Sequence, residues 1–164
     1  MTPTPTGRLV PTDQGYNLTI TKTLPVAVEH AWDYLTESQF TEGWIGPWEG
    51  NGAVGETIKL YLGFEEGKPG FHVEILECQA PVRLRVKTLD DKLPWDLAVD
   101  LSGSEDQTQL HFTMYDADPT TIGEIGPGWE YYLDQLAAVI AGDPVPDFDD
   151  YYPTQRSYFE NQRP

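Results

Sequence analysis

The sequence has one cysteine, few basic residues and no long apolar segment. With Cys78 alone among 164 residues, no intrachain disulfide and no cysteine-based zinc cluster can form, so a reducing compartment fits best. No apolar run approaches the roughly 18–20 residues that a membrane span requires. The N-terminal sequence Met-Thr-Pro-Thr-Pro-Thr-Gly has neither the basic nor the apolar region of a signal peptide. We therefore expect a cytosolic protein.

Basic residues are too few to balance the acidic ones. There are 27 Asp and Glu against 10 Lys and Arg, which gives a net charge of −17. Nucleic acids and anionic membranes are bound through clustered Lys and Arg, so we expect neither as a partner and interpret the acidity as a contribution to solubility.

One expected strand carries a basic stripe on its outer face, formed by Arg83, Arg85 and Lys87. We interpret this stripe as cross-strand pairing with carboxylates rather than as a docking surface.

Motifs for nucleophilic catalysis and phosphate binding are lacking as well. No Gly-x-Ser-x-Gly nucleophile elbow occurs. Cys78 has the polar parity of its strand and no cationic neighbours in sequence, so we expect an inert thiol. The run Gly-Asn-Gly-Ala-Val-Gly over 50–55 matches Gly-x-Gly-x-x-Gly, but no strand precedes it and no helix follows, so it is interpreted as a loop. We predict no catalytic residue and no cofactor.

Histidines and carboxylates give no specific signal for a metal or an acid–base site. His72 and His111 have the opposite parity from the apolar residues of their strands, so both are expected to face solvent rather than to join a carboxylate around zinc. No metal site is predicted. Asp33, Glu74 and Asp96 are conceivable proton-transfer groups of an enzyme, but 27 carboxylates offer no way to single one out.

The chain divides into a central domain and two flanking segments. Residues 1–14 are rich in Thr, Pro and Gly and are expected to form a flexible arm. Residues 15–142 carry the patterns of one domain, and residues 143–164 form an acidic and aromatic tail. Its large side chains are too apolar for a solvated extension: Tyr151, Tyr152, Tyr158 and Phe159. The tail is therefore expected to pack back on the domain or across a homodimer interface.

Alternation of apolar and polar residues predicts six strands. They cover residues 16–24, 57–62, 71–78, 83–89, 95–102 and 108–115. The last five are separated by short connections rich in Gly, Pro and Asp, so consecutive strands should pair as antiparallel hairpins.

Helical spacing of apolar residues marks two further regions. Val28, Ala31, Trp32 and Leu35 recur on one helical face, and a short turn is expected over 38–44. A long helix is expected from residue 122 or 128 to 141, with Gly142 at its C-cap. The resulting α+β domain has an antiparallel sheet of about six strands, covered by helices on its apolar face. A curved sheet around one long helix commonly leaves an apolar cavity.

Several short motifs resemble a known superfamily in their order and spacing. They are Trp32, Trp-Ile-Gly-Pro at 44–47, Glu77 ahead of Ala-Pro-Val-Arg-Leu at 80–84, Thr-Gln-Leu at 108–110 and Gly-Trp at 128–129. Together they resemble the SRPBCC (START/Bet v 1-like) superfamily, and within it the branch named after the activator of heat-shock-protein-90 ATPase. The resemblance extends over about residues 16–142. It implies a helix-grip fold with an apolar cavity between the last helix and the concave face of the sheet.

The residues expected to line this cavity are aromatic and aliphatic. They are Trp44, Phe71, Val73, Trp95, Val99, Phe112, Trp129, Leu133 and Leu136. For Trp32 and Trp129 simple core packing is an alternative explanation. We expect the chain to bind a small aromatic or lipid-like molecule without catalysis. The resemblance leaves two alternatives: a chaperone partner that activates a heat-shock-protein-90 ATPase, and a cyclase-like enzyme.

Overall fold

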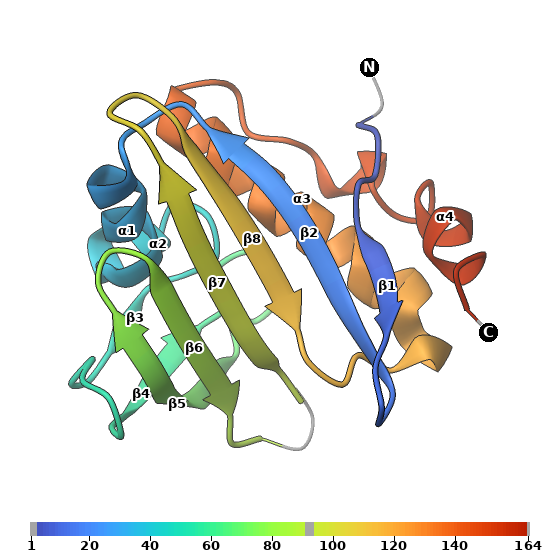
Figure 1. Cartoon of the computed structure of the whole chain (residues 1–164), viewed down its shortest axis with the longest axis horizontal. Helices are drawn as coiled ribbons and strands as arrows, with labels where there is room; N and C mark the ends of the chain where they lie inside the picture. The colour runs from blue at the N-terminus through green and yellow to red at the C-terminus, as the bar shows by residue number, and fades with distance from the viewer. Residues whose placement is uncertain (1–2, 91–93, 164) are drawn as a thin grey trace.

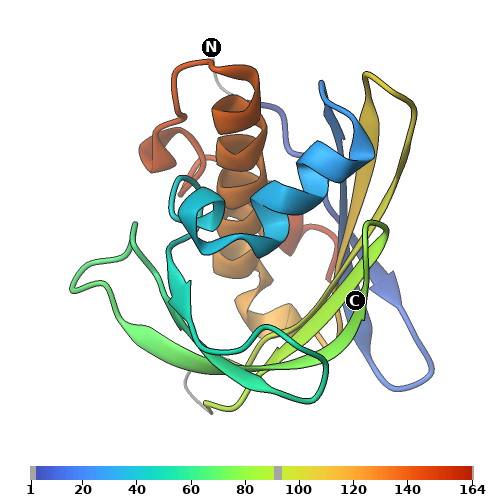
Figure 2. The ribbon, with the colours of Figure 1, turned by 90° about the vertical axis from the view of Figure 1, so that its left-hand side faces the viewer.

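One antiparallel sheet organises the protein, and it curves around a long helix (Figures 1 and 2). The computed structural model describes residues 3–90 and 94–163. The strands are β1 (Arg8–Pro11), β2 (Tyr16–Leu24), β3 (Trp48–Glu49), β4 (Thr57–Tyr61), β5 (Gly70–Gln79), β6 (Arg83–Thr88), β7 (Asp96–Gly103) and β8 (Thr108–Met114). Their order in the sheet is β1-β2-β8-β7-β6-β5-β4-β3. The expected α+β class and antiparallel meander are thus confirmed, with eight strands in place of about six.

The helices lie on the concave side of the sheet and at the C-terminal end of the chain (Figure 2). They are α1 (Val28–Thr36), α2 (Ser38–Thr41), α3 (Ile122–Ala141) and α4 (Arg156–Glu160), with short 3-10 turns over Pro119–Thr121 and Phe148–Asp150. The helix α3 begins at the earlier of the two expected starts. It ends at Gly142, whose φ of 74° is the left-handed C-cap conformation that glycine adopts without a Cβ penalty. Within 3–90 and 94–163, no helix has both the length and the hydropathy of a membrane span.

The N-terminal segment is more ordered than the sequence suggests. Residues 8–11, which were expected to belong to a flexible arm, form β1 and pair with β2, with Leu9 opposite Leu18. Leu9 is buried, and the backbone N–H groups of Thr6 and Gly7 donate to a carboxylate of Glu130 on α3. These tertiary contacts order a Thr- and Pro-rich stretch that has no local strand pattern.

A β-bulge in β5 reverses the side-chain parity at the end of that strand. The pairing of β5 with β6 shifts between Ile75 and Glu77. The extra residue, Leu76, makes Glu77 point outward and Cys78 point inward, so the expectation that Cys78 has polar parity is wrong. Strict alternation along the sequence cannot reveal such an insertion.

Ion pairs cover the outer face of the sheet. Arg83 contacts Asp100 at 2.8 Å and Glu77 at 3.2 Å, and Arg85 contacts Asp96 at 3.0 Å. The interpretation of the basic stripe as cross-strand pairing is confirmed at these two arginines. His72 and His111 are exposed, as their parity predicts.

The C-terminal tail packs back on the domain. Tyr151 and Phe159 are buried, and α4 lies beside α3 and β1 (Figure 1). The Phe159 ring lies so close to Gly126 that a Cβ there would come within 2.4 Å of it. The first of the two expectations for the tail is therefore confirmed, and a homodimer stays a prediction.

A buried charge cluster joins β2 to α3 and the tail. The ammonium of Lys22 lies 3.0 Å from Glu130 and 2.8 Å from Asp134, and the Tyr151 hydroxyl donates to Asp134 at 2.7 Å. Burial lowers the pKa of Lys22, but attraction to Glu130 and Asp134 outweighs burial and leaves the pKa raised. Burial and the hydrogen bond to Asp134 raise the pKa of Tyr151. Both groups therefore hold their protons more tightly in the folded chain.

Stability is expected to fall as the pH rises above about 10. There the unfolded chain releases protons that Lys22 and Tyr151 of the folded chain retain, so rising pH favours unfolding. Urea unfolding between pH 8 and pH 11 measures the effect. The variant Tyr151→Phe removes one of these groups and should make the decline shallower, by up to about 1.4 kcal/mol per pH unit. Equal slopes for the two proteins would contradict this assignment.

Candidate ligand-binding cavity

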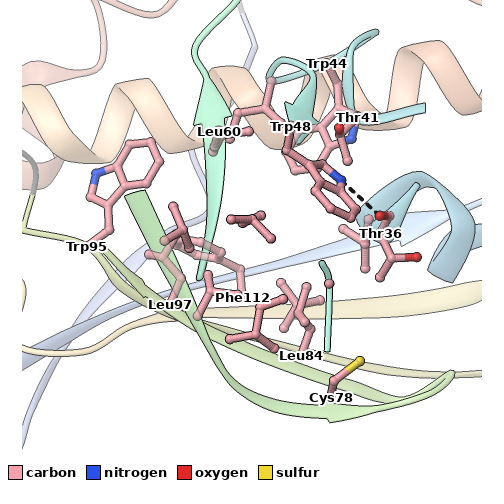
Figure 3. Close-up of a pocket in the computed structure, with 18 of the residues that line it drawn as sticks. Thr36, Thr41, Trp44, Trp48, Leu60, Cys78, Leu84, Trp95, Leu97 and Phe112 are labelled. Atoms are coloured by element: carbon pink, nitrogen blue, oxygen red, sulfur yellow. Dashed lines mark hydrogen bonds between the residues drawn. The ribbon is translucent and has the colours of Figure 1, made fainter. Parts of the chain in front are cut away.

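An apolar cavity of about 190 Å³ lies inside the curve of the sheet (Figure 3). Residues of α1, α2, α3 and of strands β3 to β8 enclose it, together with residues of the connecting loops. Native cores rarely contain voids much larger than a water molecule. An engineered cavity of about 150 Å³ binds benzene, whereas pockets for drug-sized ligands have volumes of about 300–1,000 Å³. The space therefore suits a molecule of one or two rings.

The strands contribute a continuous apolar surface. Their inward-pointing residues at the cavity are Ile58, Leu60, Val73, Ile75, Leu84, Val86, Leu97, Val99 and Phe112. They meet because alternate residues of each strand share one face and because the hairpin register places neighbours opposite one another, as with Leu84 and Val99. The curvature of the sheet keeps this surface from closing tightly on α3.

All five tryptophans of the chain line this cavity. They are Trp32, Trp44, Trp48, Trp95 and Trp129. Trp129 of α3 contacts Trp95, with ring centroids 4.9 Å apart, and Phe112, with centroids 4.6 Å apart. Such tilted and edge-to-face pairs leave aromatic faces available to a flat ligand.

Two of the indoles are held by hydrogen bonds to the backbone of α1. The Trp44 N–H donates to the carbonyl of Tyr34 at 2.7 Å, and the Trp48 N–H donates to the carbonyl of Thr36 at 3.0 Å (Figure 3). The Trp48 ring also lies over Gly52, where a Cβ would come within 3.0 Å of it. These contacts fix the rings as parts of the cavity wall.

Gly46 lies in the turn between Trp44 and Trp48, where the backbone passes close to the end of β4. Its φ of 148° is unfavourable for other residues, and a Cβ would lie 1.6 Å from the carbonyl oxygen of Tyr61. Only glycine allows this close approach to the end of β4. The turn brings Trp44 and Trp48 to the same end of the cavity.

Polar side chains are scarce in the wall. Thr36, Thr41 and Cys78 supply the only hydroxyl and thiol groups among the described lining residues, and no Asp, Glu, Lys, Arg or His belongs to that set. Within the described part of the chain, no three His, Cys, Asp or Glu side chains are grouped so as to hold a metal ion. The described wall therefore offers a ligand mainly apolar contacts.

The structure brings together most of the residues predicted for this site. Seven of the nine line the cavity: Trp44, Val73, Trp95, Val99, Phe112, Trp129 and Leu133. Phe71 and Leu136 do not line it. Phe71 lies nearer to the β4–β5 turn than Val73 and packs on the core, and Leu136 is fully buried within the core. The candidate acid–base residues Asp33, Glu74 and Asp96 lie outside the wall.

Several lining residues were not predicted from the sequence. Thr36 and Thr41 lie at the ends of short helices, where no pattern distinguishes a cavity residue from a surface one. Cys78 faces the cavity only because of the bulge in β5.

Comparison of the sequence with known protein families identifies the family to which it belongs. Residues 25–141, more than half of the chain, match the family described as activator of Hsp90 ATPase homolog 1-like protein. The chain belongs to this family. Membership in the activator of Hsp90 ATPase homolog 1-like family confirms the resemblance drawn from the short motifs, with its helix-grip fold.

Solved structures show the same fold at low sequence identity. CalU16 from Micromonospora echinospora is 22% identical, with a TM-score of 0.73, and the alignment covers 97% of this chain and 95% of that one. The protein encoded by gene BPP1335 of Bordetella parapertussis is 22% identical, with a TM-score of 0.71 and coverage of 97% and 90%. The Aha1 dimer from Colwellia psychrerythraea is 20% identical, with a TM-score of 0.64 and coverage of 76% and 95%. The comparison with curated proteins found no significant match.

Proposed function

We propose that this protein binds a small apolar molecule in the cavity and does not transform it. The observation that carries the proposal is the gathering of all five tryptophans around one space of about 190 Å³. Burial of apolar ligand surface contributes about 25 cal/mol per Å², and a preformed cavity avoids most of the cost of rearrangement. Aromatic walls favour flat aromatic ligands over flexible chains, which lose more conformational freedom on binding.

Titration with naphthalene tests the proposal directly. Because every tryptophan lines the cavity, intrinsic fluorescence should change saturably, with one site per chain. Cys78 supplies a second, independent signal, since its thiol faces the same space. Bound naphthalene should slow its alkylation by N-ethylmaleimide.

An aliphatic probe separates the two ligand classes. Titration with 1-decanol is expected to give a weaker response than naphthalene in both measurements. If neither probe changes the fluorescence saturably nor protects Cys78, the proposed function is wrong.

The family description supports a second function. It names an activator of the Hsp90 ATPase, and this chain matches that family over residues 25–141. Mixing the purified protein with an Hsp90 chaperone and measuring the ATPase rate tests this function. A rate unchanged by the protein would exclude it and leave the ligand-binding proposal unaffected.

A further inference from the structure

The hydroxyl groups of the described cavity wall lie at one end. Thr36 and Thr41 lie beside Trp44 and Trp48, whereas Trp95 lies at the opposite end (Figure 3). Among the described lining residues, hydroxyl groups therefore occur only at the end near Trp44 and Trp48.

Both threonine hydroxyls at this end already donate their protons to the protein. The Thr36 hydroxyl donates to the carbonyl of Trp32 at 2.8 Å, and the Thr41 hydroxyl donates to the carbonyl of Ser38 at 3.2 Å. A hydroxyl has one proton to donate and two lone pairs that accept. What Thr36 and Thr41 have left to offer a ligand is therefore an acceptor.

The neighbouring indoles offer no donor here either. The N–H groups of Trp44 and Trp48 are bound to the carbonyls of Tyr34 and Thr36. The end of the cavity between α1 and α2 therefore favours a ligand group that carries its own hydrogen, such as a hydroxyl or an amine N–H.

A charged ligand has no counter-charge in the described wall. None of the described lining residues is Lys, Arg or His, and the chain as a whole carries a net charge of −17. Burying an unpaired carboxylate is strongly unfavourable. The cavity is therefore expected to reject an aromatic acid of the same shape as a neutral ligand.

From these contacts, and resting on the proposed binding function, we propose that the cavity selects an uncharged aromatic molecule of one or two rings that bears a hydrogen-bond donor. The rings lie among the tryptophans, and the donor binds a lone pair of Thr36 or Thr41. Phenol-like and aromatic amine compounds have this chemistry.

Three probes with the same ring system test the selection. Equilibrium dialysis at pH 7 compares naphthalene, 2-naphthol and 2-naphthoate. We expect 2-naphthol to bind roughly two- to tenfold more tightly than naphthalene, the effect of one net hydrogen bond. The affinity of 2-naphthoate should be at least about tenfold below that of 2-naphthol.

Variants of the threonines locate the effect. The double variant Thr36→Val/Thr41→Val should bind 2-naphthol no more tightly than it binds naphthalene. Thr21→Val is the matched control, because Thr21 is exposed on the outer face of β2 and its hydroxyl pairs with His111. The control should retain the preference of the unmodified protein.

The outcomes separate this inference from the proposed function. If naphthalene binds but 2-naphthol gains nothing, or if 2-naphthoate binds equally well, the selection is overturned and ligand binding stands. If none of the three probes binds, the proposed function itself fails. The comparison of probes on the unmodified protein needs no variant, so it holds even if the double variant does not fold.

Discussion

Replacing Val99 by phenylalanine is expected to lower the affinity for naphthalene at least about tenfold while the protein stays folded. Val99 lines the cavity and lies opposite Leu84 of β6 and Phe112 of β8 in the strand register. A phenylalanine ring there would occupy the space that a naphthalene molecule needs. Because the ring enters an empty volume rather than a packed one, the melting temperature should change little or rise.

The matched control for this variant is Ser102→Phe. Ser102 lies on the same strand, β7, and is exposed. This substitution adds the same ring outside the cavity, so naphthalene affinity should stay within about twofold of the unmodified protein. Equal affinities for Val99→Phe and Ser102→Phe would show that naphthalene binds elsewhere. Equilibrium dialysis and thermal unfolding supply the two measurements.

Much of the fold follows from local patterns. The six expected strands correspond to β2 and β4 to β8, with ends that differ by about one residue, and α3 ends at the glycine that the sequence marks as its C-cap. These elements have strong periodicity and clear turn residues between them. Their order also fixes the meander, because short connections force neighbouring strands to pair.

The two additional strands could not be predicted, for a physical reason. Strand β1 and the two residues before it are held by contacts of Thr6, Gly7 and Leu9 with Glu130 and with the tail, more than a hundred residues away in sequence. Strand β3 is ordered by its pairing with β4 and by the close approach at Gly46. In both cases tertiary contacts, rather than local propensity, determine the structure.

Lining residues could be predicted where inward and outward side chains alternate strictly along a strand, and not where that alternation is interrupted. Val73, Val99 and Phe112 follow strict alternation, and all three line the cavity. Cys78 does not, because one inserted residue turns it inward. The accepting hydroxyls of Thr36 and Thr41 depend on hydrogen bonds within their own helices, which composition and spacing do not show.

Removal of the Glu130 carboxylate is the second large expected effect. The side chain is 1% exposed, and it accepts the backbone N–H groups of Thr6 and Gly7 and pairs with Lys22. In Glu130→Ala these donors lose their buried partner, although Lys22 keeps Asp134 at 2.8 Å. Breaking a buried pair in this way costs about 3–5 kcal/mol. At 3 kcal/mol the melting temperature of a domain of this size should fall by roughly 6–12 °C.

Two further variants test whether the loss of stability comes from the buried carboxylate of Glu130. Glu124→Ala lies on the exposed face of the same helix and should change the free energy of unfolding by no more than about 0.5 kcal/mol. Glu130→Gln keeps an oxygen that accepts the N–H groups but loses the charge that pairs with Lys22, so its stability should fall between those of Glu130→Ala and the unmodified protein. Urea unfolding ranks the three, and equal losses for Glu130→Ala and Glu124→Ala would contradict the role given to this cluster. Since Glu130 does not line the cavity, folded Glu130→Gln should bind naphthalene as the unmodified protein does, which separates the anchoring of the N-terminal segment from ligand binding.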